Sequence, residues 1–179
     1  MLYSELIRAA SLDASLYAKV KADSTATVRA LVVVALVALA HGAGGVIRAV
    51  AFDRDSPVQS FVIGAQGEIV FWAVAASATY LVGRYVLGST ATYGQVLRPF
   101  AFAGVPGLLI LVAALASLVG AQVFVFVVLV PWRLAASFVA VRQALGLGPG
   151  KSAIALLVGV VCGLAAVGVG TATVLEALG

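Results

Sequence analysis

The sequence predicts an all-α integral membrane protein with five transmembrane helices, preceded by a short amphipathic interfacial helix. Of its 179 residues, 63% are hydrophobic and only 10% are charged, and the mean hydropathy is +1.16. Soluble domains are about half apolar and a quarter charged, so a single soluble core could not bury this much apolar surface. The spacing of the charges adds a third observation, because it leaves apolar stretches of the length that a bilayer requires.

Charged residues divide the chain into five apolar stretches, each long enough for one bilayer crossing. The predicted crossings are residues 30–47, 61–83, 97–118, 121–142 and 152–175. The third and fourth come from one run, residues 99–132, which is too long for a single crossing and long enough for two that turn near residues 117–122. At 1.5 Å per residue the first stretch gives about 27 Å of helix, close to the thickness of the hydrocarbon layer.

The distribution of lysine and arginine predicts the orientation. With a cytoplasmic N-terminus, the inner side holds Arg8, Lys19, Lys21, Arg29, Arg84, Arg98, Arg142 and Lys151, and the outer side holds Arg48 and Arg54. Basic residues concentrate on the cytoplasmic side of membrane proteins, so this arrangement is favoured over its reverse. We therefore expect a multi-pass protein of the plasma (inner) membrane, with the N-terminus cytoplasmic and the C-terminal Gly179 outside.

The chain divides into an N-terminal amphipathic helix, residues 1–22, and a five-helix membrane domain, residues 23–179. Apolar residues recur near helical spacing in the first segment, with charges between them, at Leu2, Leu6, Ala10, Ala14 and Tyr17. Two arrangements remain open. The helix lies on the inner leaflet, with Lys19 and Lys21 near anionic headgroups, or it packs against the cytoplasmic face of the bundle.

The stretch LVPWRLA, residues 129–135, places Arg133 in the middle of the fourth predicted crossing. A charge at that depth costs about 2.5–3.5 kcal/mol unless it is paired or hydrated. Glu68 is the only acid inside a predicted span and is therefore the expected partner. Counted from the outer ends of their spans, the two Cα atoms differ in depth by about 8 Å, most of which the long arginine side chain can bridge.

Two interpretations of this intramembrane polar site remain open. The ion pair fixes the packing of the helices, with Pro131 freeing a nearby carbonyl group that accepts from the guanidinium. Alternatively, Glu68 and Arg133 line a cavity or pathway, as ionisable groups inside membranes often do. His41, in the first span beside Gly42, is either a hydrogen-bonded packing residue or a proton relay that belongs to the same site.

Proline residues predict interruptions of two spans. Pro99 and Pro106, together with Gly104 and Gly107, predict that the third span is kinked or broken, because each proline removes a backbone donor. Pro131 is a further kink candidate in the fourth span. Such an interruption is typical of a hinge or a binding site in a transporter, and it also occurs as plain kinked packing.

Small residues recur every four positions in the fifth span, at Ala155, Gly159 and Gly163. A stripe of this kind lets a second helix approach closely, so this face is expected to meet protein rather than lipid. The second helix belongs either to the same bundle or to another copy of the chain. Both alternatives remain open.

The sequence does not suggest catalysis, a metal or a cofactor. It shows no Ser/His/Asp set, no metal-ligand cluster and no paired carboxylates within reach of each other, so we expect no enzymatic activity. Gly150-Lys151-Ser152 matches the end of a phosphate-binding loop, but Leu145 stands where the motif needs glycine and no strand precedes it. Nucleic acid is not an expected partner, because the basic residues are spread over several loops.

A longer pattern joins residues 80–111, YLVGRYVLGSTATYGQVLRPFAFAGVPGLLIL, to residues 141–159, VRQALGLGPGKSAIALLVG. It has a glycine near the end of the second span, a glycine-containing loop and an aromatic-Ala-x-x-Pro element. It also has a tryptophan in the fourth span and an Arg-x-Ala-Leu sequence where that span ends. The matching residues are Gly83, Gly88, Phe102, Ala103, Pro106, Trp132 and Arg142. In these features, over about residues 20 to 170, the chain resembles the prokaryotic branch of the Yip1 domain family.

The resemblance implies a five-span fold with a cytoplasmic N-terminus. Eukaryotic relatives are linked to Rab GTPases and vesicle traffic, but this N-terminal segment is too short for their acidic cytosolic region, so that role is not carried over. We expect a Yip1-like polytopic protein that acts in membrane organisation or by binding lipids or partners, a homo-oligomer or a membrane-protein partner included. The alternative is a small channel or a solute or lipid transporter organised around Glu68 and Arg133.

Overall fold

A computed structural model describes residues 2–53 and 56–178, and over these residues it contains helices and turns but no strand. The α-helices are α1 (Leu2–Ala10), α2 (Ala14–Ala22), α3 (Ala26–Phe52), α4 (Pro57–Leu81), α5 (Tyr93–Phe102), α6 (Ile110–Ser117), α7 (Gln122–Leu145) and α8 (Pro149–Leu178). A π-helical turn, η1 (Val82–Val86), extends α4, and a 3-10 helix, η2 (Val105–Leu109), separates α5 from α6.

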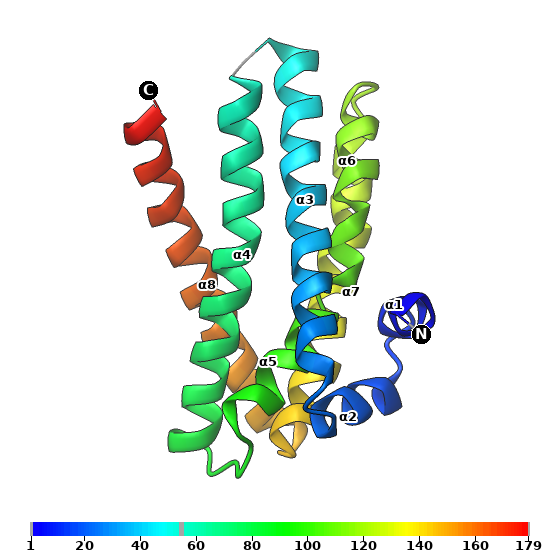
Figure 1. Cartoon of the computed structure of the whole chain (residues 1–179), viewed down its shortest axis with the longest axis vertical. Coiled ribbons are helices and arrows are strands. Elements are labelled where there is room, and N and C mark those ends of the chain that lie inside the picture. Colours follow the sequence, from blue (N-terminus) through cyan, green and yellow to red (C-terminus); the bar gives the residue numbers. More distant parts are fainter. Residues whose placement is uncertain (1, 54–55, 179) are drawn as a thin grey trace.

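Within the described part of the chain, five helical segments are long and apolar enough to cross a membrane. They are Ala26–Phe52, Pro57–Val86, Tyr93–Ser117, Val125–Leu145 and Pro149–Ala177. The predicted all-α fold with five spans is therefore confirmed, including the turn between the third and fourth spans (Figure 1). Arg54 and Gly179, which the predicted orientation also used, lie outside the described residues.

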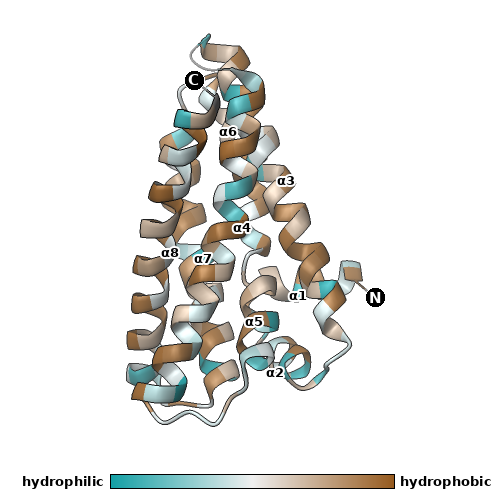
Figure 2. Cartoon of the chain, turned by 60° about the vertical axis from the view of Figure 1, so that its left-hand side comes forward, coloured by the Kyte–Doolittle hydropathy of each residue, from teal (hydrophilic) through white to brown (hydrophobic). Residues whose placement is uncertain are grey.

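The long helices stand side by side, and α4 is the central one (Figure 1). It packs along α3 and along α8, while α3 also contacts α5 and α6. Apolar residues dominate the long helices, whereas α2 is more polar (Figure 2). We call the end of the bundle that α2 and α5 form, with the connections 87–92 and 146–148, the α2 end. The opposite end, with the turn 118–121 and the last residues of α8, is the C-terminal end.

The third span is broken at Pro106 rather than at Pro99. Pro99 lies inside α5, which continues to Phe102, whereas Pro106 stands in the first turn of the 3-10 helix η2. The amide of Gly107 donates to the carbonyl oxygen of Gly104 at 2.7 Å, which closes the tighter turn. Pro131 lies inside α7, which runs from Gln122 to Leu145 as one helix.

The N-terminal segment forms two helices, where the apolar spacing predicted one. Leu12 adopts a left-handed conformation with φ 59°, and Asp13 caps α2 by accepting from the amide of Ser15 at 2.9 Å. The reason is local, because an aspartate satisfies the backbone better at a helix start than in a helix interior.

Helix α2 packs across the end of the bundle against α5 and α7, and its Leu16, Tyr17 and Val20 are fully buried. Burial raises the pKa of the Tyr17 hydroxyl, which donates to the carbonyl oxygen of Ala9 at 3.0 Å. The structure thus shows α2 packed against one end of the bundle, and that this end is the cytoplasmic one stays a prediction. Helix α1 instead exposes apolar side chains, Tyr3 by 76%, and lies beside the bundle (Figure 1).

Candidate functional site

Three helices bring Glu68 of α4, Arg133 of α7 and His41 of α3 together inside the bundle. Nη2 of Arg133 donates to Oε1 of Glu68. Both residues are the twelfth of their helices, and the two helices start at the same end, so the two residues lie at similar levels along the bundle. The predicted offset of about 8 Å came from counting the second span from residue 61, whereas α4 begins at Pro57.

His41 completes this ion cluster (Glu68, Arg133 and His41). Its Nδ1 lies 2.9 Å from the carbonyl oxygen of Val37, which can only accept, so Nδ1 carries a hydrogen. In the neutral ring, Nε2 is then an acceptor, and it faces Nη1 of Arg133 at 3.5 Å. The second carboxylate oxygen of Glu68 lies 3.6 Å from the same Nε2. The cluster thus contains one acid, one permanent cation and one imidazole that contacts both.

The ion cluster is shielded from solvent and stacked on an aromatic ring. The exposed fraction of the side chain is 7% for Glu68, 22% for Arg133 and 20% for His41. The guanidinium carbon of Arg133 lies 5.5 Å from the centre of the Phe71 ring, within cation–π range. The Phe71 ring therefore stabilises the positive charge of Arg133 in addition to Glu68.

The broken third span makes room for the cluster. A Cβ atom at Gly107 would lie 3.1 Å from Nη1 of Arg133 and 3.3 Å from Cε1 of His41. One at Gly104 would lie 3.8 Å from Oε1 of Glu68. Sequence reasoning identified these glycines as helix breakers, but not as walls of the polar site.

A cavity of about 10 Å³ adjoins the cluster, which is space for about one water molecule. Its walls include Glu68, Arg133, Phe71, Trp72 and Ser137. Phe71 and Trp72 follow Glu68 by three and four residues, so helical spacing could have indicated that they share its face. The cavity therefore has space for a water molecule but not for a larger solute.

The predicted stripe on α8 packs against α4 of the same chain. A Cβ atom at Gly159 would meet Oγ1 of Thr79 and lie 2.7 Å from the backbone oxygen of Ala75. One at Gly163 would lie 2.9 Å from the Phe71 ring, and Ala155 is fully buried. Phe71 thus has α8 on one side and Arg133 on another, and it connects the stripe to the ion cluster.

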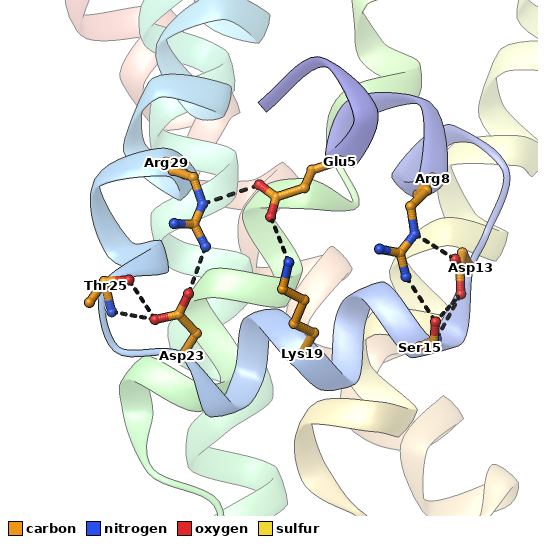
Figure 3. A network of polar contacts seen from close by, with 8 residues as sticks. All are labelled: Glu5, Arg8, Asp13, Ser15, Lys19, Asp23, Thr25 and Arg29. Atoms are coloured by element: carbon orange, nitrogen blue, oxygen red, sulfur yellow. Dashed lines mark hydrogen bonds and ion pairs between the residues drawn. The ribbon is translucent and has the colours of Figure 1, made fainter. Parts of the chain in front are cut away.

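A second polar network joins α1, α2 and α3 at the α2 end (Figure 3). Glu5, whose side chain is 6% exposed, lies 3.1 Å from Nε of Arg29 and 3.4 Å from Nζ of Lys19. Hydrogen bonds from Arg8 and then Ser15 lower the pKa of Asp13 to about 2, and those from Thr25 and Arg29 lower that of Asp23 to about 2. The sequence did not single out Glu5, because helical spacing does not show which charge of an amphipathic helix faces the bundle.

The two lysines of α2 also have protein partners. Lys19 contacts Glu5, although its side chain remains 58% exposed, and Nζ of Lys21 donates to the carbonyl oxygen of Gln143 on α7 at 3.1 Å. Arg98 of α5, only 8% exposed, donates to the backbone oxygen of Lys21 at 2.7 Å. These bonds fix α2 to α5 and α7, and sequence reasoning did not anticipate them.

Residues that carried the family resemblance make structural contacts, Gly83 and Gly88 at the α2 end and Trp132 beside the ion cluster. A Cβ atom at Gly83 would lie 2.5 Å from the Leu145 side chain, and Ser89 donates to the Leu145 carbonyl oxygen at 2.7 Å. Gly88 has φ +79°, a conformation that favours glycine. Trp132 donates through Nε1 to the carbonyl oxygen of Ala10 at 2.8 Å and so attaches α1 to α7.

Fold and site together define a multi-pass α-helical membrane protein with an ion cluster buried between its spans. The chain belongs to the Yip1 domain family, whose model matches residues 15–172 and confirms the resemblance. Membership of the prokaryotic branch stays a prediction, as does the division of the chain at residue 22; the match begins inside α2. No curated protein and no solved structure matches the chain.

Proposed function

We propose that this Yip1-domain protein acts without catalysis or transport, by binding membrane lipids or a membrane-protein partner and so organising the membrane around it. The observation that carries the proposal is the closed state of the ion cluster. Glu68, Arg133 and His41 contact one another, and the cavity beside them has space for about one water molecule. This favours the packing role of the pair over a pathway, and no described residue supports the transporter alternative.

Reconstitution tests the proposal. Liposomes that contain the purified protein are expected to leak protons and small anions no faster than protein-free liposomes. Protein isolated in a mild detergent is expected to retain phospholipid or a protein partner, identified by mass spectrometry. A flux above the protein-free rate that Glu68→Gln abolishes would overturn the proposal, and so would the retention of neither lipid nor protein.

We further propose that the protein lies in the plasma membrane with its N-terminus cytoplasmic. Support comes from the positions of the basic residues. The basic residues that are expected on the cytoplasmic side lie on α1, α2, η1 and α5, or at the α2 ends of α3, α7 and α8. Arg48, by contrast, lies one turn from the end of α3 at the C-terminal end of the bundle.

Cysteine labelling is expected to report this orientation in whole cells. In a Cys162→Ser background, a membrane-impermeant maleimide should label Asp53→Cys in intact cells. It should label Arg84→Cys and Lys151→Cys only after permeabilisation. The three substituted residues are all charged and exposed and lie near helix ends, so their substitution removes no core packing. Labelling of Asp53→Cys only after permeabilisation would show the opposite orientation.

A further inference from the structure

A cavity of about 880 Å³ opens at the C-terminal end of the bundle, between α3, α4, α6, α7 and the end of α8. Its volume falls in the range of about 300–1,000 Å³ that binding sites for small molecules occupy. No sequence motif indicated it, because its walls come from five helices.

The lining of this end cavity is mixed at the mouth, where Phe52, Leu118 and Leu175 stand beside polar side chains, and mainly apolar further in. Three polar side chains stand within about one turn of the helix ends that form the mouth: Arg48 on α3, Gln59 on α4 and Gln122 on α7. Apolar side chains line the walls further in, among them Ile63 and Ile110. A ligand that fits this lining has a polar head at the mouth and a hydrocarbon part inside.

The polar groups at the mouth suit an anion. Arg48 is exposed and forms no ion pair with any residue in the ranges 2–53 and 56–178. Asp53 and Glu176, acidic residues near the same end, are exposed and do not line the cavity. Gln59 and Gln122 add side-chain amides whose NH2 groups can donate to phosphate oxygens. A guanidinium and side-chain amides together bind phosphate oxygens well.

Two glycines close the floor of the end cavity. A Cβ atom at Gly45 would lie 2.5 Å from the backbone oxygen of Ser60, and one at Gly64 would lie 2.5 Å from the backbone oxygen of His41. Helices α3 and α4 therefore touch backbone to backbone about one turn above the ion cluster. The cavity ends there, which is the geometry of a binding site rather than of a conduit.

We infer that the end cavity binds one phospholipid with an anionic headgroup, its phosphate at Arg48 and the first part of an acyl chain along Ile63 and Ile110. The mouth lies where the spans leave the hydrocarbon layer, which is the depth of lipid headgroups. This inference rests on the proposed lipid-binding function and assigns it a place and a headgroup charge.

Native mass spectrometry tests the inference on the full-length protein, given equal amounts of phosphatidylglycerol and phosphatidylcholine with identical chains. We expect one retained phosphatidylglycerol, favoured by roughly tenfold, because its phosphate charge is uncompensated, whereas the choline ammonium of phosphatidylcholine offsets the phosphate and is repelled by Arg48. Arg48→Gln should bring the ratio close to one. Ile63→Trp and Leu118→Trp, two partly exposed lining positions, should fill the cavity and reduce retention of both lipids.

Arg142→Gln is the matched control, since it removes the same charge from an exposed position on α7 at the α2 end, and it should leave the preference unchanged. An unchanged preference in Arg48→Gln, or full retention in both tryptophan variants, would overturn the inference and leave lipid binding elsewhere intact. Displacement of the lipid by millimolar inorganic phosphate would overturn it in favour of a soluble anion. Retention of no lipid and no partner would instead contradict the proposed function itself.

Discussion

Arg133→Leu is expected to destabilise the protein in detergent more than the double variant Arg133→Leu/Glu68→Gln does. The single change leaves a carboxylate that is 7% exposed without its cation, and breaking a buried pair from one side costs about 3–5 kcal/mol. The double variant removes both charges and should recover much of this loss. Thermal unfolding of the wild type, both single variants and the double variant gives the coupling energy directly.

Arg142→Leu provides the control for this cycle. It removes an arginine from the same helix, α7, at an exposed position with no ion pair to a described residue. Its effect should be small and should add to that of Glu68→Gln. Strict additivity between Arg133→Leu and Glu68→Gln would mean that the two side chains do not interact, contrary to the geometry of the ion cluster.

Gly159→Leu is expected to be the most damaging change in α8. Its Cβ atom would meet Oγ1 of Thr79 and lie 2.7 Å from the backbone oxygen of Ala75, and a backbone atom in a helix cannot move aside. Overpacking of this kind costs about 1–3 kcal/mol and sometimes more, because the two helices must separate. We expect a lower melting temperature and reduced expression, with no change in the oligomeric state of the protein that remains folded.

Gly168→Leu makes the same substitution on the same helix where nothing lies within 4 Å of the new Cβ atom. It should leave the melting temperature nearly unchanged. Light scattering after size exclusion separates the alternatives for the stripe of Ala155, Gly159 and Gly163. A Gly159→Leu protein that stays fully stable while a dimer becomes a monomer would place this stripe between two copies of the chain.

The positions of the spans followed from the sequence because charges are costly inside a bilayer. The helix ends did not follow as well, and α4 shows why. Its first residues, Pro57 to Ser60, are not apolar enough to indicate a membrane span. Proline fits the first turn of a helix, so the helix starts before the apolar stretch does. The break after residue 10 was not predicted, because the spacing of apolar residues does not show that Asp13 prefers to cap a helix.

The partner of Arg133 could be predicted because Glu68 was the only acid inside a predicted span. The rest of the site needed the structure. Gly104 and Gly107 gain their role from their position beside side chains on three other helices, and no local pattern encodes that. The end cavity is even harder to predict from the sequence. Arg48 and Gln122 are ordinary residues at helix ends, and only the fold brings them to one opening.

The division of the third span has a mechanical consequence. Its first part, α5, is attached to α2 through Arg98, whereas its second part, α6, forms a wall of the end cavity through Ile110. Between them η2 lacks the continuous hydrogen-bond ladder of an α-helix, and its Gly107 lies against Arg133 and His41. We therefore expect the span to bend at η2 rather than to move as one rod, with α5 held by α2 and α6 following the contents of the end cavity.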